Sequence, residues 1–240
     1  MGKATFFLHD VTEKDFEILA EIIRNKGGFN CSLKGKDDYE NYYCYVEETI
    51  NELLKYGSNT LGPKEKYYDV LKKVCNKLNV SYHTDEDMGR SLLEKVMNSV
   101  FDNWSSEQKK GFIDTVLKDE KDREKFYREG EYFDFRSWFR AGGFTSYILA
   151  AIIANSISTS VLGRGLSIAA KVAFTRALTF LSGPLALLAA VWTVKEVAGP
   201  AYRVIVPAVI YIEALRVMQT AGENGVEKSE SEENKGFILL

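Results

Sequence analysis

The stretch AGGFTSYILAAIIANSISTSVLG, residues 141–163, holds 23 residues and no charged side chain. A helix of this length can cross the hydrocarbon layer of a bilayer, which takes about 20 apolar residues. A second run of 18 uncharged residues follows at 177–194. Polar residues in the second half of the first run, and Gly183-Pro184 in the second, weaken both as spans. We therefore predict an apolar helical hairpin over residues 144–198 that is marginal for crossing a membrane.

The charges divide the chain into three parts. Residues 1–140 hold 23 Lys and Arg against 27 Asp and Glu, residues 141–220 hold 6 against 2, and residues 221–240 hold 2 against 5. This partition predicts a polar amphipathic helical region, an apolar and mildly basic region, and a short disordered acidic tail. The net charge of -3 gives no general attraction to nucleic acid, and we expect no nucleic-acid partner.

Helical periodicity recurs in the front region. Its clearest case is one apolar stripe at 3.6-residue spacing, formed by Tyr67, Val70, Leu71, Val74, Cys75 and Leu78. Further helices are predicted after the capping residues Thr12 and Thr84, over residues 40–55, and after Ser105, which forms a capping box with Gln108. No alternating strand pattern is sustained. The predicted fold class is all-α: an amphipathic helical bundle followed by the apolar hairpin and a C-terminal helix.

The C-terminal helix is expected in a third apolar stretch, Val204 to Ile212. Pro207 should start or kink this helix, which is predicted to end near Gln219. The Glu-, Ser- and Asn-rich residues after Ala221 favour disorder. The final residues 237–240, FILL, either fray or dock into a groove.

Basic and aromatic residues flank the apolar region, a composition typical of a membrane interface. The same residues also suit a core between two helical layers, with arginine stems lying over apolar surface. Arg203 stands between Tyr202 and apolar residues, so it requires a carboxylate such as Glu196, a carbonyl end or water. The predicted membrane or partner contacts are Arg136, Trp138, Arg140, Arg164, Lys171, Arg176 and Arg203.

Motifs for catalysis or cofactor binding are weak. Gly163-Arg164-Gly165 lacks the third glycine of a dinucleotide loop and the Gly-Lys-Ser/Thr ending of a phosphate loop. His9 and His83 lie in no metal-binding spacing, and Cys75 falls on the apolar stripe of a helix. The sequence predicts a non-enzymatic protein with no cofactor and no metal.

Three stretches resemble the YaaW-like family of bacterial proteins, some of which are labelled as related to ubiquinol-cytochrome c chaperones. They are LLKYGSNT at residues 53–60 with the helix after Tyr67, SVLGRGL at 160–166, and AYRVIVPAV at 201–209. Together they span residues 50–218. The resemblance implies a helical protein that handles another protein or a membrane complex, and it brings no catalytic residue with it.

Two functions remain open at this point. In the first, the hairpin inserts into a membrane or lies at its surface, guided by the basic residues on anionic lipid, and a pore-like role is compatible with it. In the second, the apolar helices are the core of a soluble chaperone or scaffold that binds a protein client. Three cysteines in no disulfide pattern favour a reducing compartment. We expect a cytoplasmic protein, peripheral or integral at the inner membrane.

Overall fold

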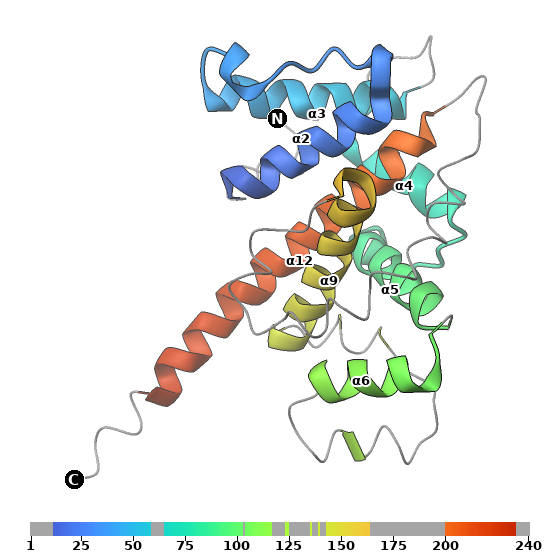
Figure 1. Ribbon diagram of the computed structural model, residues 1–240, viewed down its shortest axis with the longest axis vertical. Coiled ribbons are helices and arrows are strands. Elements are labelled where there is room, and N and C mark those ends of the chain that lie inside the picture. Colours follow the sequence, from blue (N-terminus) through green and yellow to red (C-terminus); the bar gives the residue numbers. More distant parts are fainter. Residues whose placement is uncertain are drawn as a thin grey trace.

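The computed structural model describes residues 12–58, 65–102, 104–116, 123–124, 135, 139, 143–163 and 200–233. Within these ranges every regular element is an α-helix or a short 3-10 helix, and no strand occurs (Figure 1). The predicted all-α fold class is therefore confirmed.

Local sequence signals explain where the first helices begin and end. α2 (Glu13–Gly27) starts at Thr12, whose hydroxyl accepts a hydrogen bond from the Asp15 amide, and it stops where Gly28 takes a positive φ of 57°. The 3-10 turn η1 (Gly28–Asn30) follows α2, and η2 (Lys36–Asp38) precedes α3. α3 (Tyr42–Gly57) is capped by Asn41. Both helices match the predicted positions.

The next helices also follow the predicted caps, with one difference. α4 (Tyr67–Lys77) carries the predicted apolar stripe, and α6 (Ser106–Val116) begins with the reciprocal Ser105–Gln108 bonds of a capping box. Thr84 accepts from the amide of Asp87, as expected of a cap. The acids after it form a separate 3-10 turn, η3 (Asp85–Asp87), ahead of α5 (Met88–Phe101).

Two long helices come from the apolar region. α9 (Gly143–Leu162) is the first arm of the predicted hairpin, and the second arm at 177–194 lies outside the described residues. α12 (Tyr202–Glu233) is a single helix that contains Pro207. The expected end near Gln219 is wrong, because α12 continues past Gly222 and Gly225 to Glu233; the Glu and Lys residues among these positions favour helix, whereas the two glycines do not. The helix thus continues through residues 222–233, for which the composition had predicted a disordered tail.

α12 is the centre of the molecule. It packs against α2, α3, α4, α5 and α9, and it runs roughly opposite to α9 (Figure 1). All side chains from Val204 to Leu215 are buried. The apolar region and the amphipathic helices therefore share one hydrophobic core.

A smaller aromatic cluster lies where α5 meets α6. Phe112 of α6 is fully buried, and its ring lies 5.0 Å from that of Trp104 and 6.2 Å from those of Phe101 and Phe135. These ring pairs are edge-on or tilted, the geometries that aromatic quadrupoles favour. The cluster attaches α6 to the end of α5.

Candidate functional site

Most of the predicted contact residues fall outside the described part of the chain. This applies to Arg136, Trp138, Arg140, Arg164, Lys171 and Arg176. Among the predicted contacts, the structure describes Arg203.

Arg203 is exposed near the start of α12. Its Nε atom donates a hydrogen bond of 3.1 Å to the carbonyl oxygen of Lys26, in the last turn of α2. A cation beside the carbonyl end of a helix interacts favourably with the helix dipole. The expected environments included a carbonyl end, and this is the one observed; Glu196 lies outside the described residues. Arg203 therefore joins α12 to α2 and keeps its charge at the surface.

α9 carries no charged residue and is buried on every face over most of its length, unlike an ordinary amphipathic helix, although Ser146, Asn155, Ser156 and Ser158 are polar. Its side chains from Ile148 to Ser158 are all buried, although this length covers about three helical turns. Thr159 and Ser160, which follow directly, are exposed. A helix that is hydrophobic all round belongs either in a protein core or in a membrane.

By length and composition, two described helices could cross a bilayer. They are Thr145–Leu162 of α9 and Tyr202–Ala221 of α12, with 67% and 83% of their residues buried inside the protein. Core helices of soluble proteins pass the same test, so the result is weak evidence. It is compatible with membrane association.

A buried carboxylate fixes α12 to its neighbours. Glu213 is 4% exposed, and its Oε1 atom accepts a 2.7 Å hydrogen bond from the hydroxyl of Tyr67 on α4. Arg216, one turn later, donates to both carboxylate oxygens at 3.1 and 3.2 Å. A charge at this depth is tolerated because it is both paired and hydrogen-bonded.

Gly89 makes room for this carboxylate. A Cβ atom at position 89 would lie 2.6 Å from the carboxyl carbon of Glu213. Real Cβ atoms do not approach other carbon atoms so closely, so any side chain at position 89 would force the carboxylate of Glu213 to move. The cluster formed by Tyr67, Gly89, Glu213 and Arg216, which we call the Glu213 cluster, thus joins α4, α5 and α12.

The ionisable side chains of Tyr67 and Cys75, next to Glu213, have raised pKa values. Burial, with Glu213 beside it, raises the pKa of Tyr67 well above its ordinary value. Burial also raises the pKa of the Cys75 thiol to about 12, so this cysteine stays protonated at neutral pH. Across the described residues, no group of three or more His, Cys, Asp and Glu side chains is placed to hold a metal ion. The geometry supports a structural role for the cluster.

Asp15 is a second buried carboxylate, at the start of α2. It is 2% exposed; its Oδ2 atom accepts a 2.6 Å hydrogen bond from Thr12, whereas Oδ1 has no hydrogen-bond partner. The hydroxyl of Tyr211 on α12 donates to the Asp15 backbone carbonyl at 3.1 Å. Burial raises the pKa of Asp15, and the Thr12 bond offsets this in part.

Replacing Asp15 with asparagine should stabilise the protein at pH 7. A raised pKa means that the folded state prefers the protonated acid, so Asp15 stabilises the fold at low pH and loses this contribution as pH rises through its folded pKa. An asparagine amide has the same shape as the carboxyl group without the charge. The stability gap between variant and wild type should close as pH falls and vanish below the ordinary aspartate pKa of 3.8. Urea unfolding at several pH values measures the stability difference between Asp15→Asn and wild type. If the variant is less stable than wild type at pH 7, the pKa of Asp15 is not raised in the folded protein.

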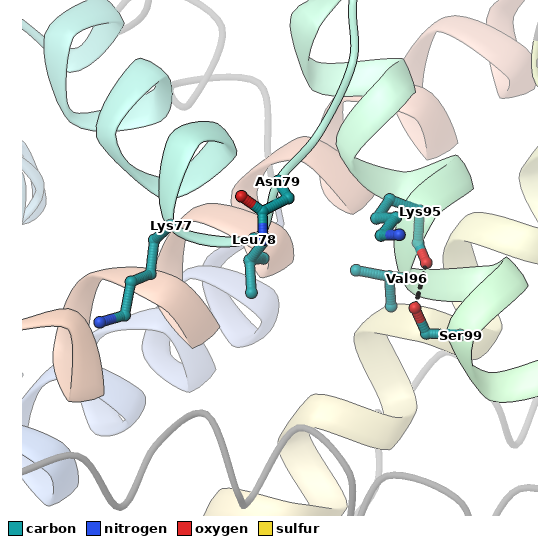
Figure 2. A pocket seen from close by; sticks show the side chains of 6 residues that line it. All are labelled: Lys77, Leu78, Asn79, Lys95, Val96 and Ser99. Carbon is teal, nitrogen blue, oxygen red and sulfur yellow. Dashed lines mark hydrogen bonds between the residues drawn. The ribbon is translucent and has the colours of Figure 1, made fainter.

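A shallow groove lies between the end of α4 and the middle of α5. Its volume is about 240 Å³, and it is lined by Lys77, Leu78, Asn79, Lys95, Val96 and Ser99. Figure 2 shows the amines of Lys77 and Lys95 on opposite sides of the groove. The Ser99 hydroxyl donates to the backbone carbonyl of Lys95 at 2.8 Å. Because the two cations do not converge, the groove is a poor site for an anion.

Sequence reasoning missed the Glu213 cluster and Asp15. One signal was available for the first: Glu213 is one of two acids in residues 141–220, with Arg216 three positions later on the same helix face. Tyr67 and Gly89 could not be found in this way, since they come from distant segments.

Comparison with known proteins gives clear relatives. A UPF0174 protein of Helicobacter pylori strain J99 is 32% identical, and the match covers 93% of this chain and 94% of the relative. A second UPF0174 protein of that strain is 29% identical over 73% of this chain and 89% of its own length. One from strain 26695 is 27% identical over 78% and 97%. No family model matches the chain, and no solved structure matches it.

Proposed function

This chain belongs to the UPF0174 family, and from its own structure we propose that it is a non-enzymatic helical protein that associates with membranes through its apolar region. In water α9 is held in the core against α12. At a membrane α9 is the arm that inserts. The names of the relatives state no activity, and the properties of the two long helices support the proposal.

The difference between α9 and α12 carries the proposal. α12 contains Glu213 and Arg216, and moving these charges into hydrocarbon would cost about 2.5 to 3.5 kcal/mol each on insertion scales. α9 contains no charged residue, and its 20 residues make a helix about 30 Å long, which matches the hydrocarbon thickness of a bilayer. Asn155, Ser156 and Ser158 reduce the gain from insertion, but α9 has no charge to move into hydrocarbon, so α9 is the helix that exchanges protein contacts for lipid contacts and α12 stays with the bundle.

The second candidate function is a soluble chaperone or scaffold. The burial of α9 and α12 in one core favours it, because this is how core helices of soluble proteins look. The resemblance to YaaW-like proteins and their chaperone label belongs to this reading and stays a proposal. So does a location in the bacterial cytoplasm or at the inner membrane.

Flotation with liposomes decides between the two functions. Purified protein is mixed with vesicles of phosphatidylcholine and phosphatidylglycerol, floated on a density gradient and washed with carbonate. Wash-resistant flotation is the result expected for insertion. Protein that stays in the soluble fraction at low salt overturns the membrane proposal and leaves the scaffold function.

A fluorescent label on α9 tests which helix enters the lipid. Cys31 and Cys44 are changed to serine, the buried Cys75 is kept, and an environment-sensitive dye is attached to Ser160→Cys, an exposed position. We expect its emission to shift to the blue with anionic vesicles, because the dye leaves water. The same dye at Arg90→Cys, exposed on α5, is the matched control and should not change. Flotation without a shift at position 160 would mean that α9 stays in the bundle.

A further inference from the structure

Cys31 is a half-buried free thiol directly after the 3-10 turn η1. Its backbone amide donates a 3.1 Å hydrogen bond to the carbonyl of Gly28, which ties it to the end of α2. Cys44 on α3 is also half-buried and free, whereas Cys75 is buried in the core. The chain therefore has two partly accessible thiols, and they lie in different surroundings.

The hydroxyl of Tyr56, near the end of α3, lies beside Cys31. A Cβ atom at position 27 would overlap this hydroxyl oxygen, and it would lie 2.9 Å from the Cβ atom of Cys31. Both groups therefore border the same small space, which is left by the missing side chain of Gly27. The hydroxyl points into the space that the thiol also faces.

This hydroxyl is buried and lacks a partner. Tyr56 is 8% exposed, and its hydroxyl oxygen makes no hydrogen bond with any of the described residues, although Cys31 and Glu52 lie close to it. The Glu52 carboxylate is already occupied, because it accepts bonds from the amide and hydroxyl of Ser32 and from the amine of Lys55. A buried hydroxyl without an acceptor costs stability. Tyr56 thus holds a donor in place for an acceptor that the reduced protein does not supply.

The Tyr56 hydroxyl keeps its proton at neutral pH. Burial raises the pKa of Tyr56 well above its ordinary value, and the neighbouring Cys31 and Glu52 act in the same direction. The negative charge of Glu52 is matched by Lys55, whose amine lies 3.1 Å from its Oε1 atom. This pair therefore adds no net charge that would oppose ionisation of the Cys31 thiol, and the thiolate is the nucleophilic form of cysteine.

We propose that Cys31 is a site of oxidation by hydrogen peroxide, at which the Tyr56 hydroxyl binds the oxygen that the sulfur gains. The thiolate attacks one peroxide oxygen, so that an S–O bond forms and the O–O bond breaks. The sulfur loses two electrons to the peroxide. The second oxygen leaves as hydroxide and takes up the proton released by the thiol, which gives water. The product is a sulfenic acid, whose oxygen is the acceptor that Tyr56 lacks.

The oxidised sulfur lies where three helices are held together. The backbone carbonyl of Tyr56 accepts a 2.9 Å hydrogen bond from the amide of Ala201, just before α12. Arg203 joins α12 to the last turn of α2 through the carbonyl of Lys26. The site therefore belongs to the junction of α2, α3 and α12. It stands apart from the membrane association proposed above, because the reaction requires no lipid.

Labelling with dimedone, which reacts with sulfenic acids, tests the site in the full-length protein. The reduced protein is treated with hydrogen peroxide and dimedone, and the adduct at each cysteine is quantified by peptide mass spectrometry. Parallel labelling with iodoacetamide corrects for the exposure and ionisation of each thiol. After this correction we expect the adduct to form about tenfold faster at Cys31 than at Cys44, the factor that one hydrogen bond to a charged group provides. Cys75 should stay unlabelled.

Tyr56→Phe removes the hydroxyl and keeps the ring. We expect its corrected rate at Cys31 to fall about tenfold, to the level of Cys44. Tyr45→Phe is the matched control, since Tyr45 is a fully buried tyrosine on the same helix whose hydroxyl also lacks a partner among the described residues. This control should react like wild type at Cys31. Circular dichroism verifies that both variants are folded.

Three results would overturn the proposal. Equal corrected rates at Cys31 and Cys44 in the wild type would mean that exposure alone governs oxidation. A wild-type rate in Tyr56→Phe would mean that the hydroxyl does not bind the added oxygen. An equal loss in Tyr45→Phe would mean that any change in the packing of α3 slows the reaction.

Discussion

Replacing Gly89 with alanine lowers the free energy of unfolding by about 3 kcal/mol, the largest loss we expect from adding a single methyl group to this protein. The new Cβ atom collides with the carboxyl group of Glu213. Glu213 must then move, and the hydroxyl of Tyr67 loses its partner in the core. Urea unfolding followed by circular dichroism measures the change.

A double-mutant cycle shows whether Glu213 is the cause. In a Glu213→Ala background the collision is gone, and alanine at position 89 should then be neutral or stabilising by up to about 1 kcal/mol, since alanine favours helix over glycine. The sign of the Gly89→Ala effect therefore reverses. Gly35→Ala, at an ordinary φ of -65°, is the control and should stay within about 0.5 kcal/mol of wild type. Equal losses at position 89 in both backgrounds would exclude the carboxylate as the origin.

Truncating Phe112 to alanine costs about 3 to 4 kcal/mol, the ordinary range for a fully buried phenylalanine. The ring contacts Trp104, Phe101 and Phe135, so its removal leaves a cavity between α5 and α6. Because the cluster attaches α6, the loss should also raise amide hydrogen exchange in α6 more than in α2.

Leucine at position 112 is the matched control for this cavity. It keeps most of the apolar volume and should cost roughly 1 kcal/mol. A Phe112→Ala protein as stable as wild type, or equal exchange in α2 and α6, would contradict the attachment role of the cluster.

The sequence predicted the helices well because their signals are local. The 3.6-residue stripe of α4, the Thr12 cap of α2 and the Ser105 capping box each lie within one short segment. The end of α12 was predicted too early, since the apolar residues that marked it stop before the helix does.

The candidate sites were harder to predict because they depend on distant segments. Tyr67 and Glu213 are 146 positions apart and meet only when α4 packs on α12. Asp15 and Tyr211 are likewise 196 positions apart and meet only when α2 packs on α12.

The central position of α12 has a consequence for biosynthesis. Asp15 and Lys26 in the first described helix contact residues 196 and 177 positions later. At translation rates of about 5 to 20 residues per second, the ribosome needs on the order of 10 to 30 seconds to go from Gly57 to Ala221. During this interval the nascent amphipathic helices have no central helix to cover their apolar faces. The shared core can therefore form only after α12 has been synthesised. We expect the yield of folded protein to depend on how well the nascent chain is protected from aggregation during this interval.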